Sequence, residues 1–121
     1  MSGRDDLIAR IRAASRPLPK PVTVEGIGEC FVRVMTPYDS EIARQAIARH
    51  AAKQDGRDTG RFLATILCDA EGAAMFDADS DDDTLMLSQL PGDAAAAIFK
   101  AHREANGIVT TAEEAQALGK A

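Results

Sequence analysis

The chain has 121 residues, enough for one domain with tails, and 45% of them are apolar. However, 23 residues are alanine, there is no Trp and there are only four Phe, so we expect a thin core that gains stability from a partner or from self-association. The net charge of −5 argues against a nucleic-acid-binding surface, because attraction to phosphate requires a basic patch.

The charge is distributed unevenly along the chain. Residues 1–61 carry 11 Lys and Arg against 8 Asp and Glu, a net charge of +3, whereas residues 62–121 carry 3 against 11, a net charge of −8. The sum recovers −5. Such asymmetry can align copies head to tail, although a solvated acidic surface is the more common explanation.

The two cysteines, Cys30 and Cys68, lie far apart and form no CxxC pair. This spacing disfavours a disulfide framework and fits a reducing cytoplasm, with both residues expected as small buried apolar side chains or free thiols. The segment at residues 1–6 is acidic and polar with no apolar run behind it, and no stretch approaches about 20 consecutive apolar residues. We therefore expect neither a signal peptide nor a membrane-spanning segment.

A first helix is predicted over residues 4–14, where Leu7, Ile8 and Ile11 recur at helical spacing behind two aspartates. Alternating prolines follow, and each one restricts the preceding residue to extended geometry. We therefore assign residues 1–21 to an N-terminal helix and a Pro-rich lead.

A β-hairpin is predicted next. Residues 22–24 and 30–35 are rich in β-branched and apolar side chains, and two glycines lie between them. In the second arm, Cys30, Val32 and Val34 form the more uniformly apolar face, which we expect to face the core.

The second helix has a clear start signal. Thr36 is a suitable N-cap, Pro37 fits the first helical position, and Asp39 can return a hydrogen bond as a variant of the capping box. We expect this helix to end near Lys53 and residues 54–60 to form a flexible break.

Two further helices are predicted in the acidic half. The cleanest apolar stripe in the chain runs from Phe62 to Ala70 and predicts a helix closed by Gly72. Ser80 can cap the helix after it, with Asp83 three residues further on.

The last long helix is alanine-rich. Pro91 is expected in its first turn, and it should run to Asn106 with Gly107 as the glycine that follows its C-terminus.

Together these elements predict an α+β fold, mostly helical, with five or six helices and one β-hairpin near the N-terminus. We assign residues 22–108 to a globular helical domain and residues 109–121 to a C-terminal tail or short helix. The expected core residues are Val32, Val34, Ile42, Ile47, Phe62, Leu63, Ile66, Leu67, Phe76, Leu85, Leu90, Ile98 and Phe99.

The acidic run at residues 77–83 invites a comparison with calcium-binding loops. An EF-hand loop that began at Asp77 would need glycine at its sixth position and glutamate at its twelfth, but Asp82 and Ser88 stand there. We expect these acids to precede and cap a helix N-terminus instead. No metal site and no cofactor is expected.

Candidate catalytic residues are equally weak. His50 and His102 lack the spacing of metal ligands, and we expect His102 on the surface. No serine lies in a GxSxG context, and Cys68 is followed by Asp69, whose charge would raise the pKa of the thiol. We therefore expect no catalytic residues and no enzymatic activity.

In their order and spacing, the elements over residues 20–108 resemble the tail assembly chaperones of long-tailed, lambda-like, non-contractile bacteriophages and prophages. The pieces that carry the resemblance are the proline lead into residues 22–24, the strand at 28–34, the turn at 35–37 into a charged helix, the segment 63–72, Met75 and Phe76, the Asp-rich helix start through Asp83, residues 85–91, and the alanine-rich helix that ends at 104–107.

This resemblance implies a function. Such chaperones bind the tape-measure protein, a largely helical and aggregation-prone rod, and keep it soluble until the tail-tube protein polymerises around it. It also implies a location in the cytoplasm of the bacterial host and absence from the mature virion. In this family a longer product, made by translational frameshift, often contacts the tail-tube protein. Neither nucleic acid nor a membrane is expected as a partner.

The alternative interpretation is a small acidic protein-interaction module, such as a regulator or a head–tail joining factor, with no chaperone role. Genomic context separates the two, because the chaperone interpretation requires a tail-tube gene before this one and a very long helical reading frame after it. In either case Ile108, Val109 and Leu118, on a polar C-terminal segment, are candidate apolar anchors for a partner.

Overall fold

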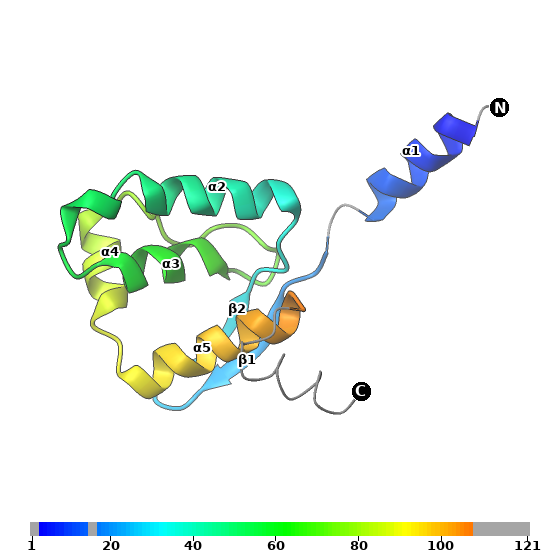
Figure 1. The fold of residues 1–121 in the computed structure, drawn as a ribbon. Helices are drawn as coiled ribbons and strands as arrows, with labels where there is room; N and C mark the ends of the chain where they lie inside the picture. The colour runs from blue at the N-terminus through cyan, green and yellow to red at the C-terminus, as the bar shows by residue number, and fades with distance from the viewer. Residues whose placement is uncertain (1–2, 15–16, 108–121) are drawn as a thin grey trace, which may run out of the picture.

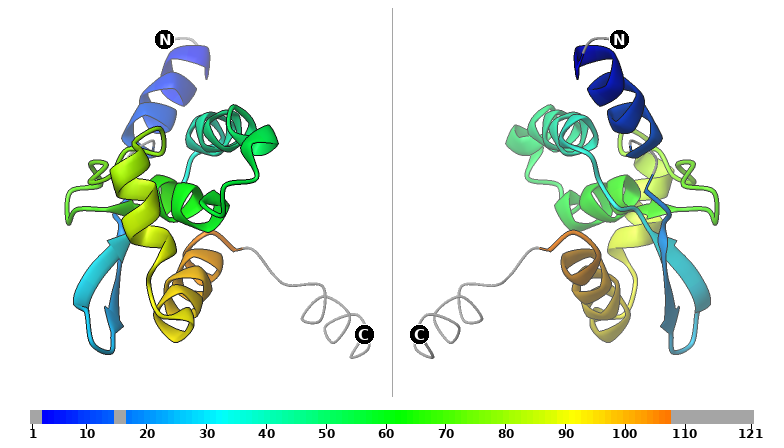
Figure 2. Two further views of the ribbon diagram at one scale, coloured as in Figure 1. Left: turned by 90° about the vertical axis from the view of Figure 1, so that its left-hand side faces the viewer. Right: turned by 90° about the vertical axis from the view of Figure 1, so that its right-hand side faces the viewer.

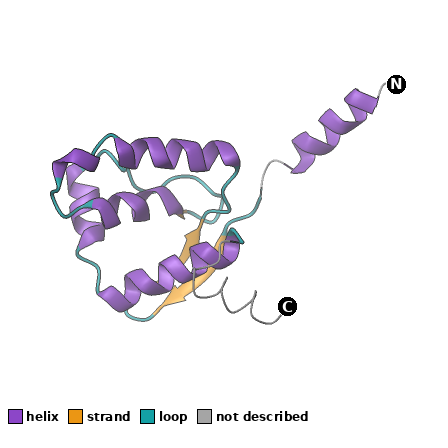
Figure 3. Cartoon of the chain, in the orientation of Figure 1, coloured by secondary structure: helices purple, strands orange, loops and turns teal. Residues whose placement is uncertain are grey.

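The structure is a computed structural model that describes residues 3–14 and 17–107. Within these residues it contains five α-helices and one three-stranded antiparallel sheet, which confirms the α+β, mostly helical fold (Figures 1 and 3). The elements are α1 (Gly3–Ala14), β1 (Lys20–Val24), β2 (Gly28–Val32), α2 (Pro37–Ala48), the 3₁₀ turn η1 (Ala51–Lys53), α3 (Asp58–Ile66), β3 (Leu67–Cys68), α4 (Asp81–Ser88) and α5 (Gly92–Ala105).

The predicted hairpin is present as β1 and β2, joined by a turn at residues 25–27. Gly26 and Gly28 have φ values of +85° and +101°, a backbone conformation that favours glycine. The face that carries Val24 and Val32 is buried beneath α5, which packs across both strands (Figure 1). The expected inward direction of Val32 is therefore confirmed, although β2 ends at this residue and does not continue to residue 35.

The third strand was not predicted. The apolar stripe from Phe62 to Ala70 indicated one continuous helix, but α3 ends at Ile66, and Leu67 and Cys68 form β3 alongside β2. Leu67 is paired with Val32, and the Arg33 N–H donates to the Ile66 carbonyl at 2.8 Å. Pairing with the edge of the hairpin thus overrides a local pattern that fits a helix.

The second helix begins as predicted. The Thr36 side chain accepts from the Asp39 N–H, and the Asp39 carboxylate accepts from the Thr36 N–H, so the capping box is complete. The helix ends at Ala48, before the expected position. It faces α3 with its small residues, since Ala43 and Ala46 are buried, whereas Ile42 is exposed and the expectation that it belongs to the core is wrong.

The backbones of α3 and α4 approach each other closely where the two helices cross. A Cβ atom placed on Gly60 would lie 2.0 Å from the Thr84 carbonyl oxygen and 2.3 Å from Ser88 Oγ. The Gly60 N–H donates to the same Ser88 hydroxyl at 3.0 Å. The crossing turns Thr84 and Leu87 inward and leaves Leu85 exposed, so the placement of Leu85 in the core is also wrong.

The segment before α3 is held by a buried cation. The Arg61 side chain is 1% exposed, and its guanidinium donates to the Asp55 carboxylate at 2.5 and 3.0 Å and to Asp58 at 3.0 Å. The hydrogen bonds from Arg61 hold the pKa of the Asp55 carboxyl well below its usual range. Residues 54–60 were expected to form a flexible break, but this ion pair ties Asp55 to the first turn of α3.

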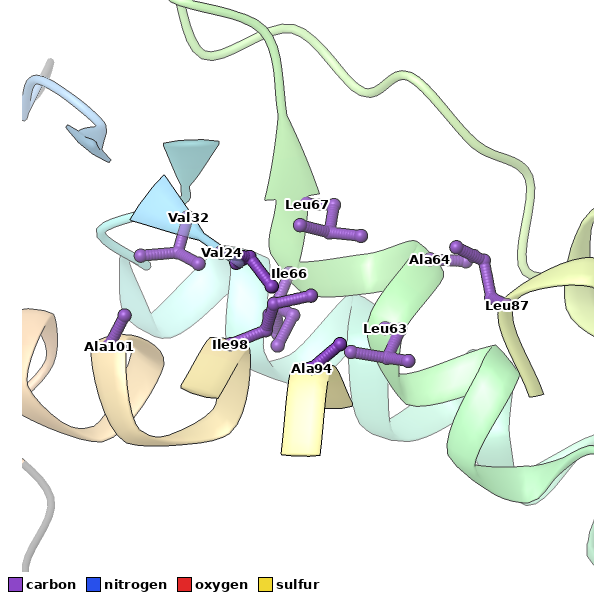
Figure 4. Close-up of a cluster of buried hydrophobic side chains, with 10 residues drawn as sticks. All are labelled: Val24, Val32, Leu63, Ala64, Ile66, Leu67, Leu87, Ala94, Ile98 and Ala101. Atoms are coloured by element: carbon purple, nitrogen blue, oxygen red, sulfur yellow. The ribbon is translucent and has the colours of Figure 1, made fainter. Parts of the chain in front are cut away.

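The hydrophobic core lies between the hairpin, α3, α4 and α5 (Figure 4). Of the expected core residues, Phe62, Phe76, Leu90 and Phe99 are only partly buried at its margin. Its buried members are Val24, Val32, Leu63, Ala64, Ile66, Leu67, Leu87, Ala94, Ile98 and Ala101.

The C-terminus of α5 is fixed to the start of α2. The Asn106 side chain accepts from the Met35 N–H at 2.7 Å and donates to the Arg33 carbonyl at 3.1 Å. Gly107 has a φ of +66°, as expected for a glycine that follows a helix. The tail or short helix predicted over residues 109–121 lies outside the described residues.

Candidate partner-binding groove

An apolar groove opens where the hairpin turn, the segment after β3 and α4 meet, and its volume is about 330 Å³. Both views of Figure 2 show these three parts of the chain on the same side of the molecule, opposite α2. We call this feature the apolar groove. The side chains that define it are Ile27, Leu67, Met75, Met86, Leu87 and Ile98.

The floor and the rim of the apolar groove differ sharply in exposure. Leu67, Leu87 and Ile98 belong to the buried core and form the floor. At the rim, Met75 is 58% exposed and Met86 is 51% exposed. Methionine side chains are flexible and polarisable, so they adapt to differently shaped apolar partners. A core that continues into an exposed methionine rim is suited to covering an apolar surface of another polypeptide.

Local hydrogen bonds position the rim. After β3 the Asp69 carboxylate accepts from the N–H groups of Glu71 and Ala73, both at 2.9 Å, and Gly72 closes the turn with a φ of +90°. This tight turn returns the chain along β3, where Ala74 forms a bridge with Cys68. Met75, the next residue, therefore lies beside the sheet.

The acidic run at residues 77–83 positions α4, which forms another wall of the apolar groove. The Ser80 hydroxyl accepts from the Asp83 N–H at 3.2 Å, which confirms the predicted cap of α4. Asp79 accepts from Arg49 and His50 at the end of α2, and Asp81 accepts from Arg57. These contacts join the basic half of the chain to the start of α4 and fix the helix that carries Met86.

The walls of the apolar groove carry only one sign of charge. Residues 21–32 and 62–99 contain every residue that lines it, and these two stretches contain no Lys, Arg or His. The same stretches contain ten carboxylates, of which Glu29 lines the groove itself. Glu29 is thus the one charged residue in the lining of the apolar groove, and it favours an occupant whose flanking residues are basic. A cation is also near, because the Arg33 side chain interacts with the lining residue Cys68.

The two cysteines also line the apolar groove, but they are not activated. Burial raises the pKa of both thiols, and Glu29 raises that of Cys30 further. The thiolate is the nucleophilic form of cysteine, so a raised pKa lowers reactivity. Cys68 is 1% exposed and its thiol contacts the Phe31 carbonyl oxygen at 3.8 Å. Both side chains act here as small apolar surface.

Two other hollows have a different character. One, of about 490 Å³, lies between α2 and residues 74–79, and its lining mixes cations and anions such as Arg33, Asp39 and Arg49. Another, of about 330 Å³, lies between α2 and the end of α5 and includes His102 and Asn106. The apolar groove is distinguished from both by its apolar floor and by a lining whose one charged residue, Glu29, is acidic.

The position of His102 corrects the sequence-based prediction. It was expected on the surface, but it is 5% exposed and packs edge-on against Phe62, with ring centroids 5.3 Å apart. The prediction failed because the alanine-rich helix buries its 94–98–101–102 face against the hairpin and α3, and position 102 lies on that face.

Neither the acidic run nor any other cluster forms a metal site in the part of the chain that the structure describes. Within residues 3–14 and 17–107, no group of three or more His, Cys, Asp or Glu side chains is arranged to hold a metal ion. Asp77 and Asp83 instead accept from backbone N–H groups of the loop before α4. Over the same residues, no helix combines the length and the apolar character that a membrane crossing requires.

The anchors proposed from the sequence, Ile108, Val109 and Leu118, lie outside the described residues. The structure instead brings together Ile27, Met75 and Met86, which sequence reasoning did not select because they come from three separate segments. One signal was available in the sequence, since residues 62–99 combine leucines and methionines with carboxylates and contain no basic residue.

No protein-family model, no curated protein and no solved structure gives a significant match to this chain. The residues and geometry of the chain itself must therefore carry any functional assignment.

Proposed function

We propose that this chain is a tail assembly chaperone of a long-tailed, non-contractile bacteriophage or prophage. In this proposal it binds the tape-measure protein and keeps that rod soluble until the tail tube polymerises around it. The chain acts in the cytoplasm of the bacterial host, leaves before the tail is complete and makes or breaks no covalent bond. The resemblance over residues 20–108 names the family, and the apolar groove supplies a physical means of holding a helix.

The single observation that carries the proposal is the continuity between the buried core and the exposed methionine rim. An amphipathic helix binds a groove of this kind by inserting apolar side chains at positions i, i+3, i+4 and i+7. Met75 and Met86 can adjust to successive, non-identical turns of a long rod, because methionine tolerates varied packing. A chaperone that must hold many different turns of one client needs this tolerance more than it needs a precise fit.

The charge around the apolar groove determines which client helices bind best. Carboxylates such as Glu29 attract lysine and arginine that flank an apolar stripe, and they repel acidic segments. The same charge disfavours nucleic acid as a partner. A frameshifted longer form would bring the tail-tube protein to the client through its added domain, and this contact does not require the apolar groove.

Co-expression with the tape-measure protein of the same phage tests the proposal. Met86→Asp places a charge on the rim, and Leu85→Asp is the matched control, since Leu85 is 43% exposed on the same helix but does not line the apolar groove. We expect the soluble fraction of the tape-measure protein to rise with the native chain and with the Leu85 variant, and to fall severalfold with the Met86 variant.

The proposed function is wrong if the tape-measure protein is equally insoluble with and without the native chain. If the native chain solubilises its client and the Met86→Asp variant does so equally well, the chaperone assignment stands but the apolar groove is not the client site.

A further inference from the structure

The methionine side chains of this chain differ in their access to solvent. The sequence contains four methionines, and the structure describes three of them. Met75 and Met86 are 58% and 51% exposed at the rim of the apolar groove, whereas Met35 is only partly exposed and packs against the core. The Met35 sulfur also accepts a hydrogen bond from the Ser40 hydroxyl at 3.8 Å. Among the described methionines, the two at the rim therefore have the most accessible sulfur atoms.

The two cysteines do not compete with these methionines for an oxidant. Cysteine is oxidised as the thiolate. Burial raises the pKa of the Cys30 and Cys68 thiols, so both remain protonated at neutral pH. Cys68 is in addition 1% exposed, which keeps an oxidant away from its sulfur. In the part of the chain that the structure describes, Met75 and Met86 are therefore the sulfur-containing side chains most open to oxidation.

Oxidation of these two side chains changes the chemistry of the groove entrance. The methionine thioether is apolar and polarisable, whereas methionine sulfoxide is polar. The floor behind the rim consists of the core residues Leu67, Leu87 and Ile98. An apolar molecule that enters the groove must strip water from any polar oxygen at the rim, which is unfavourable when no donor replaces that water. Sulfoxides at the rim therefore weaken apolar binding without any change in the floor.

We propose that Met75 and Met86 form an oxidation site that controls access to the apolar groove. Hydrogen peroxide transfers one oxygen atom to the thioether sulfur: the S–O bond forms as the O–O bond breaks. The sulfur loses two electrons, and the other oxygen leaves as water with both protons. Methionine sulfoxide reductases restore the thioether. One consequence rests on the proposed function, namely that the oxidised chain loses its hold on the client.

The first measurement follows oxygen addition at each methionine when the purified native chain is treated with hydrogen peroxide. Mass spectrometry after cleavage at aspartate separates positions 75 and 86, because the acidic run at residues 77–83 lies between them. We expect Met75 and Met86 to be oxidised at least about fivefold faster than Met35, since their sulfur atoms are more accessible.

The second measurement reports the state of the apolar groove through binding of Nile red, an uncharged dye whose fluorescence rises in apolar surroundings. Three proteins are compared: the native chain, the double variant Met75→Leu with Met86→Leu, and the double variant Met75→Gln with Met86→Gln. Leucine keeps the rim apolar and cannot form a sulfoxide, whereas the glutamine amide imitates the polar sulfoxide. Because both positions are exposed, circular dichroism and the Tm should report the same folded domain for all three.

Before treatment, we expect the native chain and the leucine variant to bind the dye with similar affinity and the glutamine variant to bind it at least about fivefold more weakly. After treatment with peroxide and removal of the excess, the native chain should fall to the level of the glutamine variant. The leucine variant should keep its affinity, because its rim contains no oxidisable sulfur.

Four results would overturn the inference. Met35 could be oxidised as fast as the rim methionines, or the native chain could bind no dye. The oxidised native chain or the glutamine variant could bind the dye as tightly as the untreated native chain, or the leucine variant could lose as much affinity on oxidation as the native chain does. None of these measurements involves the tape-measure protein, so the failure of this inference and the failure of the proposed function are distinguishable.

Discussion

His102 is a titratable side chain placed inside an apolar environment. Its ring contacts Phe62, and its Nδ1 atom lies 3.2 Å from Nδ2 of Asn106, which makes Nδ1 the acceptor of that hydrogen bond when the ring is neutral. Burial lowers the pKa of His102, and the charge of Arg103 lowers it further. The folded state therefore prefers the neutral imidazole.

The free energy of unfolding should depend on pH through this residue. Since the unfolded chain binds the proton more readily, the contribution of His102 is fully present above its ordinary pKa of 6.5 and is lost as the pH falls below that value. We expect urea unfolding of the native chain to show a decline in stability from pH 6.5 toward about pH 5, and the variant His102→Gln to show a flatter profile over the same range. Equal slopes for the two proteins would contradict this account of His102.

At the scale of elements, the fold depends on the close crossing of α3 and α4. Gly60 permits it, because the absence of a Cβ atom lets the Thr84 carbonyl and the Ser88 hydroxyl approach the α3 backbone. The crossing sets the direction of α4 and therefore the position of Met86 at the rim of the apolar groove.

Gly60→Ala should destabilise the protein by about 1–3 kcal/mol, because the added methyl group meets backbone atoms that cannot move without a shift of α4. Gly92→Ala is the matched control: Gly92 is also helical, and a Cβ atom there has nothing within 4 Å. The control should alter the free energy of unfolding by no more than about 1 kcal/mol, toward greater stability. Chemical denaturation of both variants makes the comparison, and equal losses of stability would contradict the close crossing.

Local signals in the sequence predicted some element boundaries well. The capping box at Thr36, the cap at Ser80 and the glycine at position 107 all stand where the pattern placed them, because each depends on a few neighbouring residues. The short strand at Leu67 and Cys68 could not be predicted in the same way. The apolar stripe that contains these two residues fits a helix equally well. Only pairing with β2, which is remote in sequence, makes them a strand.

The apolar groove could not be predicted from the sequence for a related reason. It combines the hairpin turn, residue 75 and α4, and no local pattern states that these segments meet. The sequence favoured C-terminal residues as anchors because they are apolar in a polar setting, whereas Met75 and Met86 stand among apolar neighbours. The prediction that Ile42 belongs to the core was wrong because α2 approaches α3 closely. This approach buries alanines of α2 and leaves the larger Ile42 side chain exposed.

At the scale of the whole molecule, some charges of the basic and acidic halves pair with each other and others remain at the surface. Internally, Arg49 and Arg57 from the basic half pair with Asp79 and Asp81 of the acidic half. Externally, the apolar groove has Glu29 as the one charged residue of its lining. If the proposed function holds, Glu29 favours client helices whose apolar stripe has basic flanks.

If the apolar groove holds a helix of the tape-measure protein, as proposed, site-specific photocrosslinking during co-expression should capture the contact. A photoreactive amino acid replaces either Met86 at the rim or Leu85, its exposed neighbour on the same helix. We expect a covalent adduct with the tape-measure protein from position 86 and much less from position 85. Adducts of equal yield from the two positions, or an adduct from position 85 alone, would contradict it.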